Sequence, residues 1–197
     1  MTSRPAAPPA KRVPKAAVLP TTKTPCKIHP SAIVADKAQI TGEHTVEIGE
    51  NAVIHPYAKI RAEGGAVVVG RNSMVYERAV VGVAEGVNQD VTIGEGVNIE
   101  SGASVEAKIV GDGSIVDVHA AVGRGTILGM YCKVAPMERV EAGEKLEDFT
   151  VLHSNGQRRV NVTMRDHAEM RDAKAIGQEK TIELMRKLIP NAAAKWM

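Results

Sequence analysis

The sequence predicts an all-β fold, namely a parallel β-helix that is followed by a C-terminal α-helix. Three observations support this prediction. Aliphatic residues recur every six positions over most of the chain, small residues recur at a fixed offset from them, and only the last part of the chain shows helical spacing.

The six-residue period is clearest where Ile93, Ile99 and Val105 follow one another. A helix of about 3.6 residues per turn does not keep a period of six on one face, and a flat strand alternates with a period of two. The pattern therefore predicts a coiling chain whose aliphatic side chains point inward. The aliphatic positions in phase are Ile28, Val34, Ile40, Val46, Ile48, Ile54, Ile60, Val69, Val75, Val81, Val87, Ile93, Ile99, Val105, Val110, Val116, Val122, Leu128, Val134 and Val140.

The fourth residue after most of these aliphatics is small, as expected where a coil turns a corner against its own interior. These positions hold Ala32, Ala38, Ala52, Ala58, Ser73, Ala79, Ala103, Ser114, Ala120, Thr126 and Cys132. Short-period repeats of this kind are typical of parallel β-helices. The pattern resembles the hexapeptide-repeat family, which implies a left-handed β-helix of three hexamers, about 18 residues, per coil and about seven coils in this chain.

Three segments interrupt the period. Arg61 to Ala66 lengthens one hexamer, Ala84 to Gln89 places Glu85 where a small residue belongs, and Glu138 to Asp148 is acidic and lacks the small residue. We expect bulged corners or surface loops at these places.

The end of the chain has a different pattern. Asn155-Gly156 predicts a turn before a last extended piece. Beyond it, Ile182, Met185, Leu188 and Ile189 recur at helical spacing and Pro190 stops the pattern, which predicts a helix from about Gln178 to Ile189.

We expect Gly177 to separate this helix from a looser or second helical piece over Met164 to Ile176. A helix of about twelve residues is not stable alone in water, so we expect it to pack along the β-helix. Its four apolar residues, Ile182, Met185, Leu188 and Ile189, form the candidate docking site, either for the prism or for a partner. Trp196, the only tryptophan, should report on the docking.

The first part of the chain is basic and rich in proline. Residues 1–25 contain six prolines, five basic residues and no acid. This composition predicts a disordered tail; a mitochondrial transit peptide is the alternative, but the prolines oppose the amphipathic helix that it requires. The predicted organisation is therefore a tail over 1–26, the β-helix over 27–155, a partly helical linker over 156–177, and the helix with its own tail over 178–197.

Composition also bears on partners and location. Five of the 25 basic residues and none of the 23 acidic residues lie in the tail, so the rest has 20 basic and 23 acidic residues, which argues against nucleic-acid binding. No apolar run suits a membrane span, and no secretory signal opens the chain. Two distant cysteines, Cys26 and Cys132, suit a reducing compartment, so we expect a cytoplasmic protein.

Hexapeptide-repeat proteins include acyltransferases and gamma-class carbonic anhydrases, so both activities must be weighed. Zinc catalysis needs three converging ligands, but no two of the six histidines lie within ten residues of each other. The acyltransferases use a histidine base beside a long projecting loop, and His44, His55 and His119 are the candidates. None of them adjoins a long insertion in the sequence. We expect no catalytic residue, cofactor or metal.

The order of segments gives a closer resemblance. KIHPSAIV, VEIGENAVIHPYAKIRAEGGAVVVG, VGDGSIVDVHAAVGRGTILGMYCKV, RRV and TIELMRKLIPN follow one another between Lys27 and Asn191. This arrangement resembles the dynactin subunit 6 family, and its fungal members in particular. The IHPYAKIRAEGG stretch and the helix ending in LIPN are the specific parts. The basic tail and the short Ala84 to Gln89 interruption depart from the animal pattern.

The resemblance implies a structural protein rather than an enzyme. Such a subunit belongs to the pointed-end complex that caps the actin-related filament of dynactin, the cofactor of cytoplasmic dynein. Its expected partners are dynactin subunit 5, as a heterodimer, an actin-related protein and the larger subunit of that complex, without nucleic acid and without direct membrane insertion. The alternative is a hexapeptide-repeat acyltransferase or a gamma-class carbonic anhydrase-like enzyme; an acyltransferase would be expected to form a homotrimer.

Overall fold

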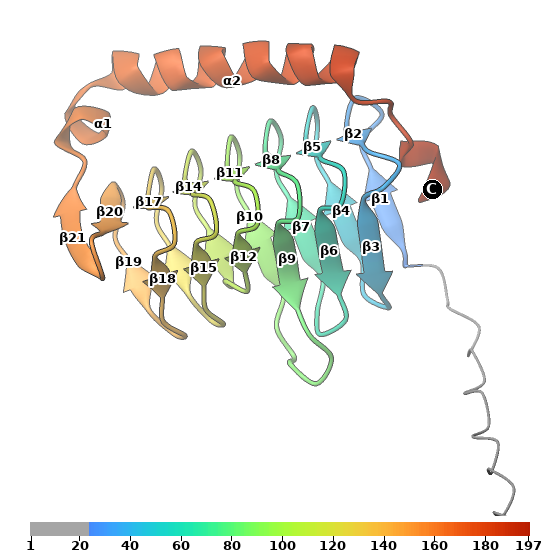
Figure 1. The fold of residues 1–197 in the computed structure, drawn as a ribbon, viewed down its shortest axis with the longest axis horizontal. Helices are drawn as coiled ribbons and strands as arrows, with labels where there is room; N and C mark the ends of the chain where they lie inside the picture. Colours follow the sequence, from blue (N-terminus) through green and yellow to red (C-terminus); the bar gives the residue numbers. More distant parts are fainter. Residues whose placement is uncertain (1–23) are drawn as a thin grey trace, which may run out of the picture.

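The computed structural model describes residues 24–197, so nearly all of the predicted tail lies outside the described residues. The chain winds into a three-sided prism, and one long helix runs along the prism from end to end (Figure 1). Three sheets form the sides, with seven strands in the first, eight in the second and six in the third. Because the eighth strand of the second sheet is antiparallel, the prism has six complete coils and two sides of a seventh.

The first sheet contains β1 (Cys26–Ile28), β4 (Val46–Ile48), β7 (Val67–Val69), β10 (Val91–Ile93), β13 (Ile109–Val110), β16 (Ile127–Leu128) and β19 (Lys145–Leu146). The second sheet contains β2 (Ile33–Val34), β5 (Val53–Ile54), β8 (Met74–Val75), β11 (Asn98–Ile99), β14 (Ile115–Val116), β17 (Lys133–Val134), β20 (Thr150–His153) and β21 (Gln157–Val160). The third sheet contains β3 (Gln39–Gly42), β6 (Lys59–Ala62), β9 (Val80–Val83), β12 (Ser104–Val105), β15 (Ala121–Val122) and β18 (Arg139–Val140). The helices are α1 (Val162–Asp166), α2 (Ala168–Leu188) and the 3-10 helix η1 (Ala193–Lys195).

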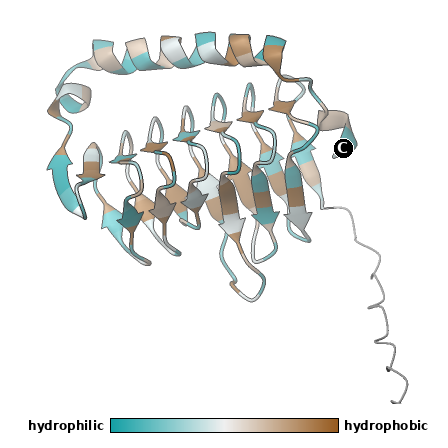
Figure 2. Cartoon of the chain, in the orientation of Figure 1, coloured by the Kyte–Doolittle hydropathy of each residue, from teal (hydrophilic) through white to brown (hydrophobic). Residues whose placement is uncertain are grey.

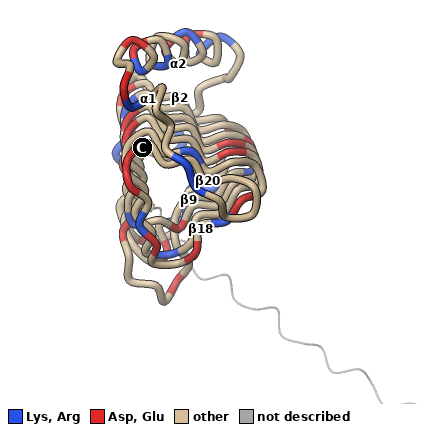
Figure 3. Tube along the Cα trace, turned by 90° about the vertical axis from the view of Figure 1, so that its left-hand side faces the viewer, with Lys and Arg blue, Asp and Glu red and all other residues tan. Residues whose placement is uncertain are grey.

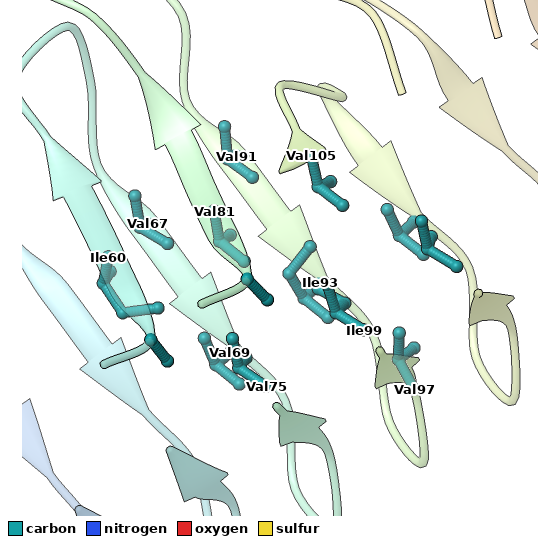
Figure 4. Close-up of a cluster of buried hydrophobic side chains, with 14 of the residues drawn as sticks. Ile60, Val67, Val69, Val75, Val81, Val91, Ile93, Val97, Ile99 and Val105 are labelled. Carbon is teal, nitrogen blue, oxygen red and sulfur yellow. The ribbon is translucent and has the colours of Figure 1, made fainter. Parts of the chain in front are cut away.

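The core is the column of aliphatic side chains predicted from the six-residue period. Every predicted inward position except Val87 is at most 9% exposed, and all eleven small positions are at most 3% exposed. The coils stack in register, with Ile93 beside Val69 and Ile99 beside Val75 in successive coils. Figure 4 shows these side chains gathered inside the prism, and Figure 2 shows hydrophobic residues on the strands that surround it.

Two of the predicted interruptions are real and one is wrong. The chain bulges between β6 and β7, and it projects as a loop between β9 and β10 (Figure 1). Val87 lies in that loop and only partly covers the core, because this connection is longer than the other corners and takes Val87 out of phase.

At Glu138 to Asp148 the repeat instead continues, since Val140 and Leu146 point inward and pair with Val122 and Leu128. Glu144 is tolerated at the small position because no complete coil follows it, and its carboxylate accepts a hydrogen bond from Arg158.

The helical region is longer and more continuous than predicted. α2 runs from Ala168 through Gly177 to Leu188, so the expected break at Gly177 is wrong. Gly177 has ordinary helical geometry, and nothing lies close to the place where a side chain would begin. Glycine destabilises a helix interior by about 1 kcal/mol relative to alanine. Tertiary contacts along α2 therefore outweigh the low helix propensity of Gly177.

Substitutions at Gly70 and at Gly177 are expected to have opposite effects on stability. A Cβ at Gly70 would overlap the carbonyl oxygen of Gly94 in the next coil, whereas a Cβ at Gly177 meets nothing. We expect Gly70→Ala to lower the free energy of unfolding by about 1–3 kcal/mol, and Gly177→Ala to raise it by about 0.5–1 kcal/mol. Chemical denaturation of the two variants measures both values. Equal stability of Gly70→Ala and the parent chain would contradict the close stacking at this corner.

Candidate protein-interaction surfaces

The C-terminal half of α2 packs on the outward face of the second sheet. Ile182 is 3% exposed and lies in an apolar cluster with Ile33, Val53 and Met74, the outward residues of three successive coils. Met185 and Ile189, two other residues of the predicted docking site, pack against the same cluster. The cluster buries the apolar face that a helix in water cannot leave exposed.

Leu188, the fourth predicted residue, does not belong to this contact. Its side chain is 63% exposed, so Leu188 does not pack on the prism. The prism contacts only one narrow face of the helix, which is formed by residues three and four positions apart. Leu188 lies on the neighbouring face of the same helix.

The N-terminal half of α2 docks through polar groups, which the apolar pattern could not indicate. Gln178 Nε2 donates to the carbonyl oxygen of Asn72 at 2.7 Å, and Lys174 Nζ donates to that of Gly96 at 3.0 Å. Both acceptors are corner residues with positive φ, where the first sheet turns into the second. The only sequence signal was the recurrence of Asn and Gly at these corners, which tolerate left-handed backbone.

Arg171 anchors the beginning of α2 over the same corner. Its guanidinium lies 6.0 Å from the ring centres of Tyr131 and Phe149, which stack on each other in successive coils. It also donates to the carbonyl oxygens of Met164 and Arg165, which end α1. One side chain therefore ties the turn between the two helices to the prism.

The space beneath the polar half is a cavity of about 420 Å³ between α2 and the corner. Its lining mixes both signs of charge, with Arg71 paired to Glu95 at 2.6 Å and Asp112 nearby. Lys174, which lines it, has a pKa lowered by burial, because the ammonium loses water without gaining a carboxylate partner. The mixed charges do not define one class of ligand, and we assign this cavity no ligand.

The residues after α2 close the first coil of the prism. The Asn191 side chain accepts from the Val34 amide at 3.1 Å and donates to the Ala32 carbonyl at 2.9 Å, while the Ala192 amide donates to the Val34 carbonyl at 2.8 Å. Ala193 is buried in the core, and Trp196 packs against it. At the other end of the same sheet, β21 pairs with β20. The C-terminal residues thereby cover the β2 edge of the second sheet, and β21 forms its other edge.

We expect Asn191→Leu to open this end of the prism, because it leaves the backbone groups of Val34 and Ala32 without their partners. The free energy of unfolding should fall by about 1–3 kcal/mol. Emission of Trp196, measured during urea titration, should shift toward that of solvated indole before the rest of the chain unfolds. Lys27→Ala is the control, because Lys27 is an exposed residue of the first coil whose Nζ pairs with Glu47 at 2.6 Å. A single transition, unchanged from that of the parent chain, would contradict the closure.

The three candidate histidines lie in different surroundings. His55 is 3% exposed, its Nδ1 donates to Glu77 Oε1 at 3.0 Å, and its ring stacks on Tyr76. Burial, with the nearby Glu100 and Glu77 carboxylates, raises the pKa of Tyr76 to about 12. A side chain so enclosed cannot reach a substrate proton, so His55 has a packing role.

His44 and His119 are exposed. His44 lies beside the loop between β9 and β10, so the expectation that no candidate histidine adjoins an insertion is wrong for this residue. The hollow there, about 220 Å³, is lined by His44, Glu63 and loop residues, and is smaller than typical ligand pockets. Glu63 accepts a hydrogen bond from Thr41 rather than from His44. No base and orienting partner come together at this histidine.

The described part of the chain has no cluster of metal ligands, and its buried cysteine is unreactive. Residues 24–197 contain no group of three or more His, Cys, Asp or Glu placed to hold one metal ion. Cys132 occupies a small inward corner, and burial raises the pKa of its thiol to about 11, which keeps it unreactive. No helix in the same residues is both long and apolar enough to cross a bilayer.

These features define a class: a hexapeptide-repeat β-helix whose side is covered by its own helix. The chain is similar in fold to a hexapeptide transferase family protein from Anaplasma phagocytophilum, with a TM-score of 0.70, 19% identity, and coverage of 82% of this chain and 92% of that one. The shared fold is the left-handed parallel β-helix. No family model matches the chain.

The curated relatives give the particular family. Dynactin subunit 6 from Nematostella vectensis is 30% identical over 176 residues, which cover 84% of this chain and 89% of that protein. Dynactin subunit 6 from Xenopus tropicalis is 28% identical over 174 residues, which cover 84% and 81%. The chain belongs to the dynactin subunit 6 family.

Proposed function

We propose that this chain is a non-enzymatic structural subunit of cytoplasmic dynactin, and that it belongs to the complex that caps the pointed end of the actin-related filament. The observation that carries the proposal is its similarity to dynactin subunit 6 along 84% of its length. Its partner in this proposal is dynactin subunit 5, with which it forms a heterodimer next to the actin-related protein and the larger subunit.

The geometry supports a docking role. A solenoid presents long rigid faces, and such faces suit extended contact with other proteins. Here the chain closes the first coil with its own C-terminal residues, and its helix covers one side. The surfaces left for partners within the described residues are the first and third sheets, the exposed side of α2, and the edge strands β1, β3, β18, β19 and β21.

The enzyme alternative lacks a constructed site. His55 is enclosed, and His44 has no orienting partner within residues 24–197. Acyl transfer by a histidine requires a base within hydrogen-bond reach of the substrate and a pocket that holds the acyl donor.

Co-expression of the full chain with the dynactin subunit 5 of the same cells tests the proposal. We expect a complex with the mass of one copy of each, measured by multi-angle light scattering, and retention of both in purified dynactin. The single chain should show no acetyl-CoA-dependent transfer and no hydration of CO2. A homotrimer with transferase activity, or the absence of the chain from purified dynactin, would contradict the proposed function.

A further inference from the structure

α2 carries a second line of apolar and small residues beside the one that packs on the prism. Met170, Leu184 and Leu188 are 44%, 51% and 63% exposed. Met170, Gly177 and Leu184 follow one another at intervals of seven residues. Thr181 and Leu188 are also seven residues apart, and each lies four residues after a member of the first set. This is the spacing of the seam between two packed helices. We call the five residues Met170, Gly177, Thr181, Leu184 and Leu188 the outer seam.

Within residues 24–197 nothing covers Leu184 and Leu188, whereas Met170 at the start of the outer seam also lines a hollow of about 340 Å³ with Tyr131 and Lys133 of the prism. The side chains that face the prism are Lys174, Gln178, Ile182, Met185 and Ile189, which lie along a different line of the same helix. Gly177 has no neighbour that requires a glycine, yet glycine weakens a helix interior. A small residue in the middle of the seam would instead allow a second helix to approach closely.

The charges beside the outer seam indicate what kind of helix fits. Lys180 and Lys187 stand immediately before Thr181 and Leu188, so they flank the seam seven residues apart. Neither makes an ion pair with any residue in 24–197. Residues at such flanking positions form ion pairs across a helix pair and select the partner. Figure 3 shows Lys and Arg on α2 where it faces away from the prism.

The same charges oppose a second copy of this chain. An antiparallel pair of α2 helices centred near Gly177 and Thr181 would bring Lys180 of one copy close to Lys180 of the other. Like charges so placed destabilise a pair. We propose that the outer seam binds an amphipathic helix of another protein, with acidic residues at the positions that face Lys180 and Lys187.

This inference rests on the proposed function in one respect: the partner is sought among the dynactin subunits. A photo-cross-linking amino acid placed at Leu184 tests it in the full chain, expressed in the cells that make it. The matched control is Ile176, which is 52% exposed but lies on the charged side of α2. We expect Leu184, and not Ile176, to cross-link to a segment of another protein with helical apolar spacing and acidic flanks.

Variants supply a second measurement. Leu184→Lys and the pair Lys180→Glu with Lys187→Glu should each lower retention in purified dynactin at least tenfold, while Ile176→Lys should not. Gly177→Gln should also lower retention, because its larger side chain would block the close approach of a second helix, although glutamine favours the helix more than glycine does. Thermal unfolding of each isolated variant checks that the fold is intact.

The outcomes separate the two proposals. Cross-linking of Leu184 to an acidic helix of a protein outside dynactin, together with absence of the chain from purified dynactin, would support the outer seam and contradict the proposed function. Cross-linking to a second copy, to a basic or non-helical segment, or at no higher level than Ile176 would overturn the outer seam. Full retention of Leu184→Lys and of the double lysine variant would overturn it as well, while leaving dynactin membership in place.

Discussion

Replacing Ile99 by aspartate is expected to prevent folding. Ile99 is fully buried in β11, between Val75 and Val116 of the adjacent coils. A carboxylate at this position would have no cation and no water, and an unpaired buried charge destabilises a core by more than about 5 kcal/mol. That loss is comparable with the whole stability of a typical domain, about 5–15 kcal/mol.

Circular dichroism and gel filtration of the purified variant would measure this loss. Thr92→Asp is the matched control, because Thr92 is the outward residue of β10 and is exposed. The control should fold with nearly unchanged stability. A soluble, folded Ile99→Asp protein would show that the register of the coils is wrong.

The second large effect is expected from Ile182→Asp. The carboxylate would lie among Ile33, Val53 and Met74, again without a cation. The helix can avoid that burial by leaving the prism, so the loss is limited by the free energy with which residues 168–197 dock. We expect the free energy of unfolding to fall by at least about 3 kcal/mol, because detachment exposes the three outward residues and opens the first coil.

Hydrogen exchange resolved by residue measures this detachment. Amides of α2 and η1 should lose protection in Ile182→Asp, while those of β7 to β15 should keep it, and Trp196 emission should become that of solvated indole. Ile176→Asp serves as the control on the exposed side of the helix. Undiminished protection of α2 in Ile182→Asp would show that the apolar cluster does not hold the helix.

The opposite errors at Val87 and at Glu138 to Asp148 have one physical cause. An aliphatic residue points inward only if the corner before it has the usual length. The length of that corner depends on how the chain packs against the adjacent coil. Val87 has the right spacing but lies in a projecting loop, whereas Glu144 has the wrong size but lies at an end where no complete coil crowds it. A single-chain period cannot distinguish these cases.

The docking site shows the same division. The spacing of Ile182, Met185 and Ile189 predicted an apolar contact, because a helix must bury such a line. It could not show that Leu188 lies outside that line, nor that Lys174 and Gln178 donate to corner carbonyls. Those carbonyls belong to Gly96 and Asn72, which are distant in sequence and come under the helix only after the coils have stacked.

By itself, the sequence determined the coil, its inward residues and the presence of a terminal helix, because each of these follows from the spacing of side chains that must leave water. The tertiary structure decided where that helix lies and what the chain ends do. Asn191 reaches Val34 and Ala32 only because α2, with about 1.5 Å of rise per residue, is long enough to return from the last coil to the first. That match between the length of a helix and the height of a stack of coils is a property of the assembled fold, and no local pattern of residues contains it.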